Sequence, residues 1–244
     1  MKFIRKKIFN LIFGASSSSV KKRISFLKTN YKRGGYHSIN QLDKQLEKYV
    51  DYDNGFYVEL GANDGVEQSN SLFFELKRNW RGILIEPSPY NFILCREQRS
   101  NQNHIFCNAC VGFDYKDKYV DMKYANLMSI SENLNLDLND KEAHIKSGEN
   151  YLKETETVFS FGAIATTLDS LLKSAKAPKI IDFISLDVEG AELEVLKGIN
   201  FDHYSFKYML IEIRNLKPIE NFLIERGYVL EKQLSEHDYL FKSV

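Results

Sequence analysis

The stretch FYVELGANDG, residues 56–65, decides the fold of this 244-residue chain. An apolar run, typical of a buried strand, ends next to an acid, Glu59, and two glycines follow, Gly61 and Gly65. In an open parallel sheet, ligands bind beyond the C-terminal ends of the strands. Glycine at that place allows close approach of the backbone and positive φ. The stretch therefore predicts a central parallel strand followed by a ligand-binding loop.

Strand and helix patterns alternate through most of the chain. Apolar runs predict strands at 56–60, 82–87, 104–112, 181–190 and 208–213. Periodic patterns predict helices at 71–80, 88–100, from about 167, after Gly190, and at 218–227. The closing runs 228–234 and 238–244 read as a hairpin. This order predicts an α/β fold with a mostly parallel sheet and helices on both faces. The hairpin is expected to add one antiparallel strand at an edge.

Charge divides the chain into two parts. Residues 1–42 carry ten Lys or Arg and no Asp or Glu, which leaves 23 basic residues against all 33 acidic ones in 43–244. We therefore expect a basic, partly helical N-terminal arm, 1–42, and one folded domain, 43–244. Inside that domain, residues 113–166 form a polar, Asn-rich excursion that interrupts the alternation and is expected on the acceptor side.

The arm begins with MKFIRKKIFNLIF, whose apolar residues fall close to one helical face. This pattern is typical of an interfacial helix attracted to anionic lipid, and residues 1–20 are the predicted contact. Docking on the acidic body or on a second subunit is the alternative, so an oligomer stays open. The apolar stretch, about six residues long, is too short for a signal peptide or a membrane span. We expect a cytoplasmic protein, peripheral at the inner face of the membrane if the arm binds lipid. The acidic body and the lack of an aromatic–basic patch argue against nucleic acid.

The three cysteines are Cys95, Cys107 and Cys110, and the last two have C-x-x-C spacing. A second pair is missing and a structural zinc ion needs four ligands, so buried free thiols are expected instead of a zinc site. Free thiols fit a reducing cytoplasm.

The glycine loop has the pattern E-x-G-x-x-x-G, which differs from the dinucleotide pattern G-x-G-x-x-G. A carboxylate suits a cationic ligand better than a phosphate. S-adenosylmethionine has an amino group and a sulfonium, and Glu59 could hold the amino group through water or a neighbour. Glu86 ends the second strand, the usual place for an acid that binds two ribose hydroxyls. A strand end with no ligand is the alternative.

A second group of acids follows the later strands. Asp187 and Glu189 lie in IDFISLDVEG, at the end of a strand, and Glu212 ends the next one. One of the first two could act as general base, and Asp187 with Glu212 could help to bind Mg²⁺ or another hard cation. The alternative for Glu212 is an ion pair with Arg214 or with the arm.

Other polar and aromatic residues have a plain explanation beside a functional one. His144 and His237 could be bases, but a histidine in a polar loop is expected to be solvated. Tyr115, Tyr119 and Tyr124 could stack on a sugar or belong to a small edge hairpin. Ser69 and Asn70 could cap a helix or contact the methionine carboxylate of the donor.

The segments VELGANDGVEQSN, WRGILIEPSP, TLDSLL and IDFISLDVEGAELEVLKG together resemble the FkbM family of S-adenosylmethionine-dependent methyltransferases. The resemblance spans roughly residues 50–244; it excludes the arm and is loose in the excursion. It implies a Rossmann-like, seven-stranded methyltransferase sheet. It also implies a donor site formed by Glu59, Gly61, Ala62, Asn63, Asp64, Gly65, Glu86, Asn108 and Ala109. We expect the neighbouring Ser69, Asn70, Pro87 and Asp187 to belong to the same site. The D-x-E-G motif falls on Asp187, Glu189 and Gly190.

The resemblance implies an O-methyltransferase that acts on a hydroxyl of a sugar, glycan or glycolipid, in a surface polysaccharide or a secondary metabolite. Two alternatives remain. One is a non-catalytic Rossmann-like module that binds a nucleoside or a partner, and the other is methyl transfer to an amide or carboxyl acceptor. The acids Glu59, Glu86, Asp187 and Glu189 favour an enzyme, because a scaffold needs no acids in its crevice.

Overall fold

The computed structural model describes residues 35–244, so the predictions for residues 1–34 lie outside the described part of the chain. The last residues of the predicted arm pack on the domain. Tyr36 stacks on Phe73 with ring centroids 4.5 Å apart, and Leu42 is buried. Within residues 35–244, no helix is both long and apolar enough to cross a membrane.

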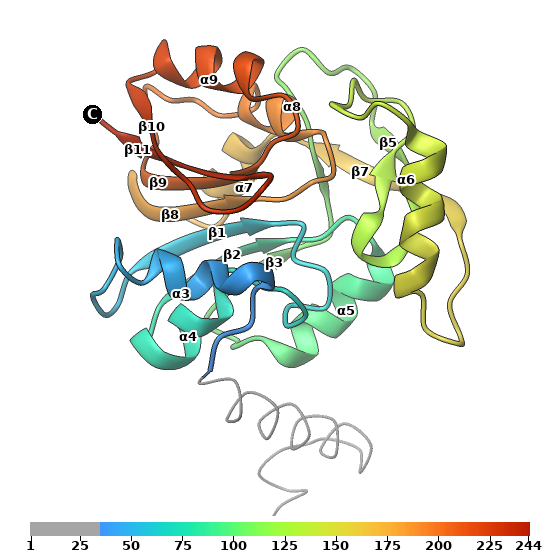
Figure 1. Cartoon of the computed structure of the whole chain (residues 1–244), viewed down its shortest axis with the longest axis horizontal. Coiled ribbons are helices and arrows are strands. Elements are labelled where there is room, and N and C mark those ends of the chain that lie inside the picture. Colours follow the sequence, from blue (N-terminus) through green and yellow to red (C-terminus); the bar gives the residue numbers. More distant parts are fainter. Residues whose placement is uncertain (1–34) are drawn as a thin grey trace, which may run out of the picture.

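The main sheet has seven strands in the order β10-β11-β9-β8-β1-β2-β3 (Figure 1). Their bounds are β1 Phe56–Leu60, β2 Arg81–Ile85, β3 His104–Phe106, β8 Ile180–Leu186, β9 Ser205–Glu212, β10 Tyr228–Gln233 and β11 Asp238–Ser243. The pairs β1–β2, β2–β3, β1–β8 and β8–β9 are parallel. The predicted α/β class and the seven-stranded, mostly parallel sheet are confirmed.

The C-terminal hairpin is present, but its order differs from the prediction. The antiparallel strand β11 lies between β9 and β10 instead of at the edge. The burial of the two strands explains this order. Leu240 and Phe241 of β11 are fully buried, whereas β10 is exposed after Tyr228. The strand with the larger apolar face therefore occupies the inner position.

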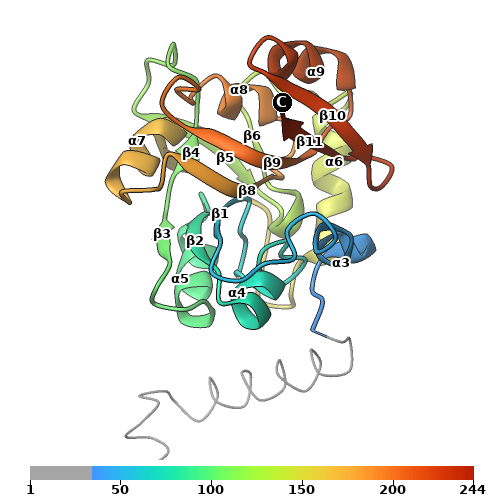
Figure 2. The same cartoon turned by 90° about the vertical axis from the view of Figure 1, so that its left-hand side faces the viewer.

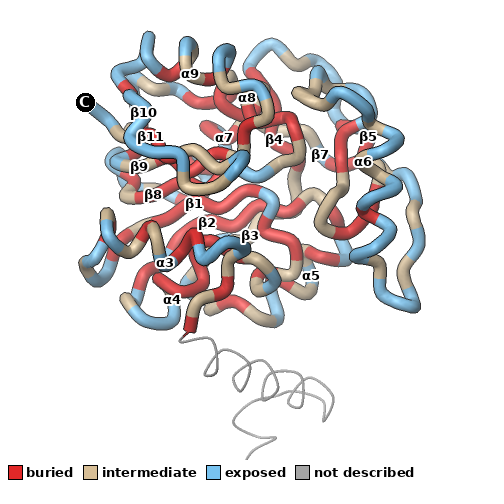
Figure 3. The backbone as a smooth tube through the Cα atoms, viewed as in Figure 1, coloured by how far each residue is buried: buried red, intermediate tan, exposed pale blue. Residues whose placement is uncertain are grey.

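Helices cover both faces of the sheet, as the alternation predicts (Figures 1 and 2). One face carries α3 Leu42–Leu46, α4 Leu72–Arg78 and α5 Pro89–Gln98, and the other carries α7 Leu168–Ser174, α8 Glu192–Leu196 and α9 Leu216–Ile224. Each set has its own apolar core, around Phe74 and Trp80 on the first face and around Leu172 and Leu196 on the second. Figure 3 shows the buried backbone concentrated in the strands between these layers.

The predicted strand 104–112 is wrong as one element. It divides into β3 in the main sheet and β4, Ala109–Cys110, in a second sheet with the order β4-β7-β5-β6. The other strands are β5 Tyr119–Tyr124, β6 Ile130–Ser131 and β7 Phe159–Thr166. The chain leaves the main sheet at Cys107 and Asn108, and the Asn108 side chain donates to the Ile164 carbonyl at 3.2 Å. An apolar run alone cannot show that it crosses between two sheets.

The polar excursion is therefore a folded part of the domain with its own sheet. Besides the strands it contains α6 Lys141–Gly148, η2 Asn126–Met128 and η3 Glu149–Tyr151, while η1 Ile39–Gln41 precedes the main sheet. Val120, Met122 and Ala163 form part of its small apolar core. Tyr119 and Tyr124 begin and end β5, which pairs antiparallel with β7, whereas Tyr115 lies before this strand. The second sheet and α6 lie beyond the C-terminal ends of β1 and β2 (Figure 1).

The order of the main sheet positions the site. From β1 the chain continues outward to β2 and β3 on one side, while β8 and β9 occupy the other side. The strand order therefore reverses between β1 and β8. A crevice outside the carboxyl ends of the strands is expected at such a reversal, and the glycine loop begins there.

Candidate active site

Gly61 brings the loop after β1 against the end of β8. Its φ is +77°, and a Cβ at this position would lie 1.9 Å from the backbone oxygen of Asp187. The N–H groups of Gly61 and Ala62 both donate to the Ile85 carbonyl at 3.1 Å. Both the positive φ and the close backbone contact require glycine, as the sequence predicts.

Glu86 is buried where β2 ends, and its carboxylate holds the glycine loop. It accepts hydrogen bonds from the backbone N–H of Asn63 at 2.9 Å and of Ser88 at 2.8 Å. Burial raises the pKa of Glu86 to about 7, although these two bonds oppose the shift. Ser88 in turn caps α5 by accepting from the Asn91 N–H, which confirms the predicted helix start. Glu86 thus lies where the sequence places the ribose acid.

A cavity of about 50 Å³ lies between the ends of β1, β2 and β8. Of the residues predicted for the donor site, Gly61, Pro87, Asn108 and Ala109 line it. Met122, Ser131 and Leu134 of the excursion form the opposite wall, which the sequence did not indicate. Binding sites for molecules of drug size measure several hundred Å³. A whole nucleoside therefore needs more room than this cavity alone offers.

Glu59 points away from this cavity and binds the segment that follows the loop. It is 4% exposed, and it accepts from the backbone N–H of Asn70 at 2.8 Å and from the hydroxyls of Ser69 and Ser71. Ser69 also accepts from the N–H of Leu72, the first residue of α4, while Ser71 occupies the N-cap position. The structure brings Glu59, Ser69 and Asn70 together through bonds inside the protein.

Asp64, in the glycine loop, makes a turn, because its Oδ1 accepts from the N–H groups of Val66 and Glu67.

One polar atom of the Asn70 side chain has no hydrogen-bond partner among the described residues. Its Nδ2 donates to Ser185 Oγ at 3.0 Å, whereas its Oδ1 is buried with no hydrogen-bond partner among residues 35–244. A buried acceptor without a partner is costly, so such an atom commonly has a ligand or a water as partner. This oxygen suits an ammonium group at the end of β8.

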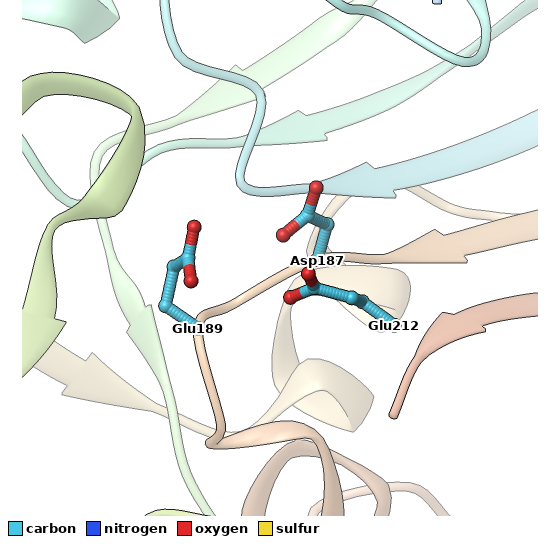
Figure 4. A group of neighbouring side chains, drawn as sticks. All are labelled: Asp187, Glu189 and Glu212. Carbon is cyan, nitrogen blue, oxygen red and sulfur yellow. The ribbon is translucent and has the colours of Figure 1, made fainter. Parts of the chain in front are cut away.

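Three carboxylates meet at the ends of β8 and β9 (Figure 4). One oxygen from each of Asp187, Glu189 and Glu212 lies within 4.8 Å of the others. Glu189 adopts a left-handed backbone with φ +56°, followed by Gly190 at +95°. A non-glycine residue in this conformation is strained and is often found at functional sites. The sequence predicted this grouping from strand ends alone.

Arg214 neutralises part of this acidic group, and His144 lies beside it. The guanidinium of Arg214 contacts Glu189 Oε2 at 3.1 Å and Glu212 Oε2 at 3.2 Å. The ion pair that the sequence left as the alternative for Glu212 is therefore present. His144 of α6 lies with its Nε2 2.9 Å from Glu189 Oε2, and its side chain is 8% exposed. The expectation of a solvated His144 is wrong, because α6 packs over the crevice. His237 keeps an exposed side chain, as expected.

The acids in this group repel one another. Enclosure by the protein, and then the charges of Glu212 and Glu189, raise the pKa of Asp187 well above its ordinary value, although the residue still reaches solvent. Burial, followed by the charge of Glu189, raises the pKa of Glu212 as well. Asp187 has no ion pair among residues 35–244, in contrast to Glu189 and Glu212. Among the three carboxylates, Asp187 therefore has the pKa that its surroundings raise furthest without an opposing cation, which favours it as the proton acceptor.

Glu192 is a residue of this turn that the sequence analysis missed. It is buried, and its Oε1 accepts from the N–H groups of Val188 and Gly190 at 3.0 and 3.1 Å. Burial raises the pKa of Glu192 to about 8. Its position two residues after Gly190, at the start of a helix, was the available signal, since acids there bind free N–H groups. Glu192 thus holds the backbone in which Glu189 is strained.

The cysteines are free thiols among the described residues, as predicted. Cys95 and Cys110 are buried and Cys107 is half-buried. Burial raises the pKa of Cys110 to about 12, so this thiol is unreactive at neutral pH.

A Rossmann-like sheet with a glycine loop after β1 and an acid after β2 is typical of proteins that bind a nucleoside-containing cofactor. Residues 59–239 match the family described as "Methyltransferase FkbM domain". The chain belongs to this family. It is a methyltransferase, and the family implies S-adenosylmethionine as methyl donor. No curated protein matches the sequence significantly.

Solved structures with a similar arrangement are also methyltransferases. A putative RNA methyltransferase from Pyrococcus horikoshii is 13% identical, with 84% of this chain and 80% of that chain covered and a TM-score of 0.39. A precorrin-6y C5,15-methyltransferase from Geobacter metallireducens is 13% identical, with 82% and 85% covered and the same TM-score. Similarity at this level carries no argument, and the assignment depends on the family match.

The residues present fit this donor. The glycine backbone at Gly61 leaves no side chain between the loop and β8. The Oδ1 of Asn70, which has no partner among residues 35–244, can accept from the amino group of the donor. Glu86 offers a carboxylate where the ribose hydroxyls are expected.

Proposed function

We propose that this protein is an S-adenosylmethionine-dependent O-methyltransferase that acts on a hydroxyl of a sugar, glycan or glycolipid. The observation that carries the proposal is the group of Asp187, Glu189 and Glu212 beside the glycine loop and the segment that follows it, residues 61–71, which we call the donor loop. Gly61 connects the acid group with this loop, because its backbone contacts that of Asp187. A carboxylate group in this place suits an acceptor that must lose a proton.

The donor, when bound, supplies a methyl carbon that is already activated by the sulfonium. The protein therefore has to hold the acceptor oxygen in line and remove its proton. Asp187 takes the proton, since its raised pKa and open side chain suit a general base. Glu189, held by Arg214, orients the acceptor through its remaining oxygen.

The charge of the crevice favours a neutral acceptor. Asp238 of β11 lies opposite Glu212 in the sheet register and adds a fourth acid near Glu212. A phosphorylated or carboxylated acceptor would meet like charges, which cost binding energy. The hydroxyl of a neutral sugar meets no such penalty and can donate to the carboxylates.

A divalent cation is a second way to activate the hydroxyl. Asp187, Glu189 and Glu212 offer the oxygen ligands that Mg²⁺ prefers, and such an ion would lower the pKa of a bound hydroxyl. It would have to displace Arg214 from Glu189 and Glu212. We therefore propose proton removal by Asp187 as the main path and a cation as its alternative.

The test is methyl transfer from radiolabelled S-adenosylmethionine to neutral glycans, glycolipids and their phosphorylated counterparts. We expect label in the neutral compounds and a product that resists alkali, because methyl ethers survive where methyl esters hydrolyse. Glu194→Gln serves as control, since this acid lies on α8 and pairs with Lys197 outside the acid group. Label found only in amides or in alkali-labile esters would contradict the proposal.

A further inference from the structure

Arg99 is a charged side chain enclosed in the interior. It follows α5, and its side chain is 0% exposed. The aliphatic part packs against the glycine loop, because a Cβ at Gly65 would lie 2.8 Å from Arg99 Cγ. A charge in such a place needs several polar partners.

The guanidinium uses its three nitrogens on partners from three elements. Nε contacts Glu75 of α4 at 2.8 Å. Nη1 donates to the Gly65 carbonyl at 2.9 Å and to Ser69 Oγ at 3.1 Å. Nη2 donates to Tyr57 of β1 at 2.8 Å and to Ser71 Oγ at 2.9 Å. Glu59 completes the set at 3.4 Å from Nη1.

These bonds join the two ends of the donor loop. Glu59 lies in β1 just before the loop, Gly65 lies in the middle of the loop, and Ser69 and Ser71 lie at its end. The Gly65 carbonyl belongs to a residue with φ +80°, so Arg99 holds the loop where its backbone is unusual. Arg99 itself does not line the cavity between β1, β2 and β8.

Stability alone is a weak explanation for this arrangement. Replacing a buried ion pair with apolar side chains of similar volume is often neutral or even stabilising, because burial of two charges costs desolvation energy. A planar group with five donors instead fixes the direction of each partner. The geometry therefore suits a role in shaping the loop.

We propose that Arg99 is the positioning residue of the donor loop. Through Gly65, Ser69 and Glu59 it holds residues 61–71 in the conformation that accepts the methyl donor, from the side that the donor does not contact. Glu59 acts with it, as the acid that orients the guanidinium. The inference depends on the proposed donor site, but the loop conformation can be measured without the donor.

The experiment compares Arg99→Lys and Arg99→Met with the wild type by hydrogen exchange and calorimetry. Lysine keeps the charge but cannot replace five planar donors, so both variants should behave alike. We expect faster amide exchange in residues 61–71 without donor, unchanged exchange in β8 and β9, and a Kd for S-adenosylmethionine at least tenfold higher.

Two controls separate positioning from general destabilisation. Arg96→Met removes an exposed arginine of α5 one turn earlier and should change nothing. Ile219→Val removes a methyl group from the opposite core and should lower Tm without changing loop exchange or Kd.

Each outcome of this experiment decides whether Arg99 positions the donor loop. Loop exchange equal to wild type in folded Arg99→Lys overturns the proposal, whatever its Tm. If neither Arg99 variant folds, Ser71→Ala, which removes one of the two acceptors of Nη2, must show the same loop-confined increase or the proposal fails. If the wild type does not bind S-adenosylmethionine, the donor site itself is wrong, whereas the exchange data still decide the role of Arg99.

Discussion

The side-chain amide of Asn63 donates to Asn126 Oδ1 at 3.2 Å, and this bond joins the donor loop to the excursion. Both residues have positive φ, +46° and +54°. Asn126 continues the connection by donating to Glu156 Oε2 at 2.8 Å and to the Tyr151 carbonyl at 3.1 Å. The backbone N–H of Asn63 binds Glu86 at the other end. A chain of hydrogen bonds thus runs from Glu86, the proposed ribose acid, through Asn63 to the excursion.

Asn126→Ala should uncouple the two sides. We expect S-adenosylmethionine to slow amide exchange in residues 119–166 of the wild type, because Met122, Ser131 and Leu134 of the excursion line the cavity beside the glycine loop. In the variant this effect should disappear, while protection of residues 59–71 by the donor persists. The free energy of unfolding should fall by about 1–3 kcal/mol, since Asn63 and Glu156 lose a buried partner. Asn133→Ala, an exposed asparagine of the excursion, is the control. Equal protection of the excursion in both variants would refute the coupling.

Glu86→Gln should weaken donor binding by about 1.5–3 kcal/mol, the usual value for charge-assisted hydrogen bonds. Calorimetry measures this change, and unchanged affinity in the folded variant would exclude Glu86 as the ribose acid.

Glu86 should also give donor binding a pH dependence. Its pKa is about 7 in the folded protein against 4.5 for the ordinary carboxyl. The raised value means that Glu86 stabilises the fold below pH 4.5 and that this contribution is lost as the pH rises through 7. The ionised form is the one that binds hydroxyls as a pure acceptor, so donor affinity should rise between pH 6 and 8. Calorimetry across this range should show the rise in the wild type and a flatter profile in Glu86→Gln.

Asp187→Asn and Glu189→Gln test the catalytic assignment. Each should retain donor binding and lose turnover by about 10² or more, with the larger loss in Asp187→Asn, because removal of the base affects only the transition state. Single-turnover rates with labelled donor measure the effect. Full activity in both variants would leave positioning as the only contribution of the protein.

Chelation separates the two ways of activating the hydroxyl. With Asp187 as base, EDTA should leave turnover unchanged, because Arg214 already compensates the charges of Glu189 and Glu212. A loss that Mg²⁺ restores would instead show that a cation occupies the acid group, and Arg214→Gln should then bind Mg²⁺ more tightly.

Local pattern was sufficient for most of the fold and for the acids at strand ends. Glu86, Asp187 and Glu212 were predictable because a parallel sheet brings the ends of its strands to one edge. The position of β11 was not, because the order of a hairpin depends on how much apolar surface each strand buries. The division of 104–112 between two sheets has no local signal either.

Long-range partners were the other gap. Arg99 looks like an ordinary polar residue after a helix, and His144 looks like a loop histidine. Their roles follow from contacts 34 residues away in sequence for Arg99 with Gly65, and 45 for His144 with Glu189. Such contacts depend on how the excursion and α5 pack, which periodicity does not report.

The basic arm remains a prediction, because residues 1–34 lie outside the described part of the chain. Its apolar face and its Lys and Arg residues predict binding to anionic vesicles, with about 1 kcal/mol from each basic residue near the surface. Deletion of residues 1–20 should abolish sedimentation with phosphatidylserine vesicles. It should leave Tm and donor binding intact, because the described core begins with Tyr36 and Leu42.

Binding of the full chain to anionic vesicles should weaken from low to high salt, since screening shortens the reach of the charges. Neutral phosphatidylcholine vesicles are the control. If the full chain ignores anionic vesicles at low salt, or if the deletion unfolds the domain or splits an oligomer, the arm is a packing element and does not bind membrane.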